Sequence, residues 1–121
     1  RTFFHLSYGY SFGVAARVAM ATYLRSVGRE KVGFTIVERK PDGSPRYVKG
    51  IRGAVERNVM RYYFALVAYL HACSLPPHEQ LEVRLRDWFA FTERYSLQLH
   101  ELEQKEYLDM KRRQYQQGNG Q

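Results

Sequence analysis

Residues 62–70 read Tyr-Tyr-Phe-Ala-Leu-Val-Ala-Tyr-Leu, and this stretch without a single charge decides the expected fold. Apolar residues at helical spacing continue on its N-terminal side at Val55 and Val59. The Pro76-Pro77 pair ends the helix on the other side, because proline cannot continue one. A helix that is apolar on nearly every side is typical of a central position. We therefore expect a central helix here, enclosed by the rest of the chain.

An amphipathic helix is expected on each side of this central helix. Residues 11–27 carry apolar side chains at spacings of three and four, and Ser11 is the expected N-cap. A second helix starts at Pro77 or His78 and follows a spacing typical of helical bundles. It either runs on to Gln117 or breaks near Gln104. The apolar seam of this second helix consists of Leu81, Leu85, Trp88, Thr92, Tyr95, Leu99 and Leu102.

The segment between the first two helices has the pattern of a β-hairpin. Val32, Phe34 and Ile36 alternate with other residues, and turn formers follow at 40–45 before a second strand at 46–49. An isolated hairpin is marginally stable in water, so we expect this one to pack on the side of the helices.

The predicted fold is therefore α+β and mainly helical, with three to four helices and one two-stranded antiparallel hairpin. We expect one globular domain over residues 1–117 and a disordered tail at 118–121. A chain of 121 residues with 45% hydrophobic residues can bury a core without a metal or a disulfide. Since no uncharged apolar run reaches the roughly 18–20 residues that a bilayer requires, we expect no membrane span and a cytoplasmic protein.

The positive charge of the chain lies almost entirely in its first half. Residues 1–62 hold twelve basic and four acidic side chains, whereas residues 63–121 have a net charge of −1. Arginine favours two-pronged contacts with phosphate or carboxylate, which indicates an exposed surface for an anionic partner. The alternative is a solvated basic face that only maintains solubility. The expected anion-binding residues are Arg39, Lys40, Arg46, Lys49, Arg52, Arg57 and Arg61.

Residues suited to chemistry are few. His71, Cys73 and His78 lie within eight residues, but their spacing points them apart, so we expect no metal site, no cofactor and a buried Cys73. Glu56, Glu93 and His100 are acid–base candidates within apolar stretches, and none adjoins a nucleophile or a glycine-rich phosphate loop. We expect no catalytic residue, although a site assembled only by folding would give the same pattern.

Association is expected from the apolar residues that lie off the seam of the last long helix. Together with the seam, Phe89, Phe91 and Leu97 exceed what one neighbouring helix covers. The ten tyrosines favour an aromatic core with hydroxyls at the surface over a ligand cage, and with these off-seam residues they also suit an interface. We therefore expect a homo-oligomer or docking on a protein partner. The expected function is a non-catalytic interaction or regulatory module with a basic surface for an acidic partner. The alternative is a nucleic-acid binding protein that uses the basic hairpin and the helix start after it.

Overall fold

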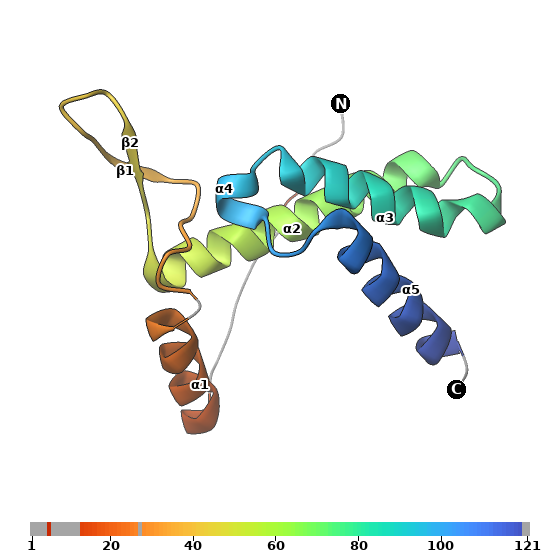
Figure 1. The fold of residues 1–121 in the computed structure, drawn as a ribbon, viewed down its shortest axis with the longest axis horizontal. Coiled ribbons are helices and arrows are strands. Elements are labelled where there is room, and N and C mark those ends of the chain that lie inside the picture. Colours follow the sequence, from red (N-terminus) through yellow and green to blue (C-terminus); the bar gives the residue numbers. More distant parts are fainter. Residues whose placement is uncertain (1–4, 6–12, 27, 120–121) are drawn as a thin grey trace. The chain divides into compact units, whose positions relative to one another are not determined.

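The computed structural model describes residues 5, 13–26 and 28–119. Helices make up 67% of these residues, and the described part of the chain contains five helices and one two-stranded antiparallel sheet, which confirms the mainly helical α+β prediction. None of the helices in this part is long and apolar enough to cross a membrane. In chain order the elements are α1 (Val14–Arg25), β1 (Ile36–Arg39), β2 (Pro45–Tyr47), α2 (Gly50–Ala72), α3 (Pro77–Glu93), α4 (Ser96–Leu99) and α5 (Gln104–Asn119) (Figure 1).

The chain divides into two compact units, Arg1–Val59 and Met60–Gln121, and α2 contributes residues to both. The single domain over residues 1–117 stays a prediction, because compact units of this kind also occur within one domain. Residues 118 and 119 of the predicted tail are the last two of α5, and residues 120 and 121 lie outside the described part.

Within the first unit, α1 is shorter than the helix expected over residues 11–27. It begins at Val14 with Gly13 as the N-cap residue and ends before Ser26. The expected cap Ser11 lies outside the described residues. Val14 and Val18 are 78% and 61% exposed, so these two apolar side chains of α1 bury little surface within the unit.

The hairpin forms with the predicted turn, but its strands are shifted from the expected ones: Val32 and Phe34 precede β1, and Val48 and Lys49 follow β2. The Lys40 N–H donates to the Ser44 carbonyl (2.9 Å), and Gly43 adopts a φ of +85° that favours glycine. The Asp42 carboxylate accepts hydrogen bonds from the backbone N–H and the hydroxyl of Ser44, and these bonds lower the pKa of Asp42. In the ladder Ile36 is opposite Tyr47 and Arg39 is opposite Pro45.

In the second unit, the C-terminal part of α2 packs antiparallel against α3. The Phe64 ring lies 6.0 Å from the Phe91 ring and 5.7 Å from the Tyr95 ring. Further along α2, His71 contacts Asp87 through its Nδ1 atom. At the other end, the Trp88 indole N–H donates to the Arg61 carbonyl (3.0 Å).

The expectation that residues 62–70 are enclosed on all sides is wrong. Phe64 and Ala68 are buried, at 8% and 1% exposure, as is Ala72 just beyond the segment. Residues four apart lie on one stripe of a helix, so only this stripe faces the interior of the unit. Most of the circumference stays in contact with solvent, because the unit provides α3 on one side of α2 and no second layer is seen among the described residues.

The long helix was expected to start at Pro77 or His78 and to break near Gln104 or run on to Gln117; it starts at Pro77 but ends at Glu93. Tyr95 leaves helical geometry (φ −121°, ψ 46°), and its ring stacks on Phe64. The short helix α4 follows and buries Leu99. The seam therefore divides between two helices, and the structure has one helix more than the upper end of the expected range.

We predict that the two faces of α2 differ in their contribution to stability. Phe64→Ala removes a ring packed among three aromatic neighbours and should lower the free energy of unfolding by about 3 kcal/mol. Tyr62→Ala on the same helix should change it by less than about 0.5 kcal/mol, because Tyr62 is 60% exposed. Urea melts of both variants measure the difference. Equal losses would show that both faces are packed.

Candidate functional site

The basic residues of the hairpin are exposed, as expected. Lys40 and Lys49 lie on the surface near its tip and its exit, and Arg39 makes only a long contact (3.5 Å) with the Gly43 carbonyl. Arg46 is 58% exposed but forms an ion pair (2.6 Å) with Glu38, its partner across the ladder. The positive charge of the hairpin is therefore partly compensated by the hairpin itself.

The remaining expected anion-binding residues are not all available for a ligand. Arg57 is only 2% exposed, so its expected exposure is wrong: its Nη1 donates to the Val32 carbonyl (3.1 Å), and this bond satisfies a buried backbone acceptor. Arg52 is exposed and pairs with Glu56 (3.1 Å). Arg61 belongs to the second unit, where it is 20% exposed and pairs with Glu101.

Glu56, an acid–base candidate, anchors the loop before the hairpin to α2. One carboxylate oxygen accepts hydrogen bonds from the backbone N–H groups of Phe34 (2.7 Å) and Thr35 (2.9 Å). The other accepts from the Thr35 hydroxyl (2.7 Å) and from Arg52. Burial alone raises the pKa of Glu56, but the hydrogen bonds from Thr35, Phe34 and Arg52 outweigh it and lower the pKa. A lowered pKa and a full set of donors describe a structural carboxylate.

We predict that Glu56→Gln destabilises the first unit by about 1–3 kcal/mol at pH 7, since it removes charge-assisted hydrogen bonds. The lowered pKa of Glu56 makes its contribution complete above the unfolded-state value near ~4.3 and lost as the pH falls through the folded-state value. The variant should therefore lose less stability than the wild type between neutral pH and about pH 3.

Denaturant melts at several pH values measure this, and Glu38→Gln is the matched control. Glu38 is 56% exposed in its pair with Arg46, so its replacement should cost less than about 0.5 kcal/mol. Equal effects of the two variants at pH 7 would remove Glu56 from its anchoring role.

The three expected interface residues differ in exposure. Phe89 is half-buried and its ring lies 5.6 Å from that of Tyr107 on α5. Phe91 is half-buried, with the Phe64 ring 6.0 Å from its own ring and the Arg94 guanidinium over its ring at 5.2 Å. Leu97 is 64% exposed. The second cover that was expected for α3 is thus provided for Phe89 by α5 of the same chain, and a role in an interface stays a prediction for all three.

The residues weighed as metal ligands or as a thiol nucleophile do not converge. His71 contacts Asp87, and His78 lies 3.4 Å from the neighbouring Glu79. Cys73 is exposed, so the expected core thiol is wrong; its Sγ donates to the Leu70 carbonyl. Among the residues described, no group of three or more His, Cys, Asp or Glu side chains is positioned to hold a metal ion.

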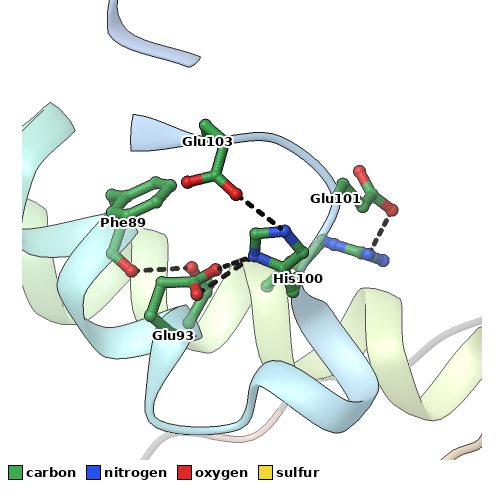
Figure 2. A network of polar contacts seen from close by, with 7 residues as sticks. Phe89, Glu93, His100, Glu101 and Glu103 are labelled. Carbon is green, nitrogen blue, oxygen red and sulfur yellow. Dashed lines mark hydrogen bonds and ion pairs between the residues drawn. The ribbon is translucent and has the colours of Figure 1, made fainter. Parts of the chain in front are cut away.

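The other two acid–base candidates are brought together. His100 Nδ1 lies 2.9 Å from one oxygen of Glu93 and 3.1 Å from the other, and its Nε2 lies 3.8 Å from Glu103 (Figure 2). The pair joins the end of α3 to the segment before α5. Arg61 and Glu101 form a second ion pair beside it (Figure 2). A carboxylate that orients an imidazole is one part of an acid–base site.

A pocket of about 260 Å³ adjoins this network, between α3, the 99–102 segment and α5. The aliphatic hydroxyl among its lining residues belongs to Thr92, which is 2% exposed and donates to the Phe89 carbonyl (3.0 Å), so it is committed to the backbone (Figure 2). The pocket therefore combines an oriented histidine nearby with a hydroxyl that is not activated. This arrangement suits binding better than nucleophilic catalysis.

The sequence analysis missed the contribution of α5 to this pocket. Tyr107, Met110 and Lys111 line it from one face of the helix. Tyr107 is 6% exposed, and burial raises its pKa to about 12. The spacing of three and four among these residues was the available indication of a face. This spacing did not show which element the face contacts, because α5 reaches α3 only through the break in helical structure after Glu93.

Comparison of the chain with protein-family models, with curated proteins and with solved structures finds no match.

Proposed function

We propose that this chain is a non-catalytic interaction module that docks on an acidic protein partner. The observation that carries the proposal is the outward side of α2 between residues 62 and 70. We call the four large exposed side chains on it the α2 face. It consists of Tyr62, Tyr63, Tyr69 and Leu70.

The α2 face has the composition of a protein interface. Its members are 60%, 44%, 50% and 52% exposed in chain order, within a stretch that contains no charge. Tyr62 and Tyr69 are two helical turns apart, as are Tyr63 and Leu70, so the four side chains share a broad side of the helix. Tyrosine is enriched in interfaces because it combines an apolar ring with a polar tip, and it often dominates binding energy. Exposed apolar groups of this kind mark interaction sites.

The charge distribution favours an acidic partner over a second copy of the chain. Residues 1–59 hold eleven basic and four acidic side chains, whereas residues 60–121 hold eight of each. Two copies would each bring a net charge of +7, so self-association works against electrostatic repulsion. The exposed Arg39, Lys40 and Lys49 instead favour association with negative groups on a partner.

Nucleic acid is the weaker alternative. Of the seven expected anion-binding residues, Arg57 is buried and three others pair with carboxylates of this chain. A phosphate backbone would compete with these carboxylates for the guanidinium groups. A neutral unit with exposed tyrosines on one helix suits a protein better than a polyanion.

The proposal predicts the chemistry of peptides that the chain selects. Dodecapeptides selected from a random library on the immobilised chain should combine acidic residues with apolar anchors. Tyr62→Ala combined with Tyr69→Ala should weaken the selected peptides about tenfold or more, because each is an exposed aromatic anchor. Fluorescence anisotropy of a labelled peptide measures the affinity. Tyr115→Ala is the matched control, since Tyr115 is 49% exposed on α5, and it should bind as the wild type does.

Two outcomes of the binding measurements would overturn the proposal. One is that the selected peptides bind the Tyr62 and Tyr69 double variant as tightly as the Tyr115→Ala control. This would place the site away from the α2 face. The other is tighter binding of mixed-sequence DNA or RNA than of any selected peptide, with an affinity that falls steeply with salt. A stable dimer at micromolar concentration in light scattering, abolished by the Tyr62 and Tyr69 substitutions, would assign the α2 face to a second copy instead.

A further inference from the structure

The pocket in the second unit has an apolar interior made by three parts of the chain. Trp88 and Phe89 of α3, Leu102 of the connecting segment, and Tyr107 and Met110 of α5 line it. Burial raises the pKa of Tyr107 further above its usual value, so the pocket wall that it forms carries no charge. None of the α2 face residues lines this pocket, so the inference below does not rest on the proposed function.

The walls of the pocket are held in place by contacts between α3 and α5. Arg112 of α5 makes two hydrogen bonds of 2.8 Å to the carboxylate of Glu82 on α3, and these bonds lower the pKa of Glu82. The rings of Trp88 and Tyr107 stack at 5.0 Å. Two-pronged pairs of this type fix orientation as well as distance. The space is therefore part of the fold of this unit and is preformed for a ligand.

Four charged residues line the pocket, and three of them already have a charged or titratable partner. Arg61 pairs with Glu101, and Glu93 contacts His100. Lys111 differs, because its Nζ donates to the neutral Gln114 (3.3 Å) and forms no ion pair with the described residues. Lys111 is thus the one charged lining residue that forms no ion pair with the described residues, and it borders an apolar interior.

We propose that this pocket binds a small monocarboxylate that carries one aromatic ring. The ring would lie among Trp88, Tyr107 and Met110, where aromatic faces and a thioether provide favourable contacts. The carboxylate would accept a charge-assisted hydrogen bond from Lys111. A volume of about 260 Å³ suits a single ring with a short acidic arm. A dianion such as a phosphate ester is disfavoured, since one cation cannot neutralise it.

Trp88 is the single tryptophan of the chain, so its fluorescence reports on this pocket alone. Titration with phenylacetate should change the emission of Trp88 in a saturable manner. Phenylacetamide has the same shape without the charge, and phenethylamine reverses the charge. Both should bind at least about tenfold more weakly, because an ionic hydrogen bond contributes a factor of that order.

Lys111→Met removes the charge, keeps an unbranched side chain one atom shorter, and should weaken phenylacetate about tenfold or more while leaving phenylacetamide unchanged. Lys105→Met is the matched control on α5, since Lys105 does not line this pocket, and it should bind as the wild type does. Thermal melts establish that both variants are folded. The methyl NMR signal of Met110 should shift with phenylacetate in both the wild type and the control.

Equal affinity for phenylacetate and phenylacetamide would overturn the proposal, as would Lys111→Met with wild-type affinity. The absence of any saturable change of Trp88 emission, with no shift of the Met110 methyl signal, would show that the space is a packing gap.

Discussion

The second unit depends on one stripe of α2, formed by Phe64, Ala68 and Ala72. These side chains are buried at a spacing of four residues, and Phe64 contacts both Phe91 of α3 and Tyr95 just after it. A stripe of this width is covered by one neighbouring helix, and it has no room for a second. Leu66 and Val67 are half-buried, and the α2 face is left outward. The proposed docking surface is thus a consequence of how few layers the unit contains.

The first unit depends on a different contact, the carboxylate of Glu56. It accepts hydrogen bonds from the N–H groups of residues 34 and 35. The loop can lie this close to α2 because residue 33 is glycine. A Cβ at this position would lie 2.7 Å from a Glu56 oxygen and 2.8 Å from the Gly53 Cα. Arg57 completes the anchor through the Val32 carbonyl. The same contacts occupy the guanidinium groups of Arg52 and Arg57, which were expected to bind an anionic partner. Of the seven expected anion-binding residues, Arg39, Lys40 and Lys49 are then the ones that form no ion pair with the described residues and are exposed.

Local chemistry made part of this fold predictable from sequence. The turn at Asp42-Gly43 and the helix start at Pro77 follow from backbone preferences of single residues, and both were predicted. The break after Glu93 was not, because the sequence there has no proline or glycine. It follows from the stacking of Tyr95 on Phe64, thirty-one positions away, and from the pairing of His100 with Glu93. The burial of Arg57 likewise depends on a carbonyl twenty-five positions away.

The most direct test of this account measures the two sides of α2 by thiol labelling in a Cys73→Ser background. Tyr62→Cys should react with a thiol reagent nearly as fast as the unfolded chain, because position 62 faces solvent. Ala68→Cys should react on the order of a hundredfold or more slowly, since its labelling requires local opening of the unit. Strong protection at both positions would contradict the account, because it would place residues 62–70 inside a core on every side.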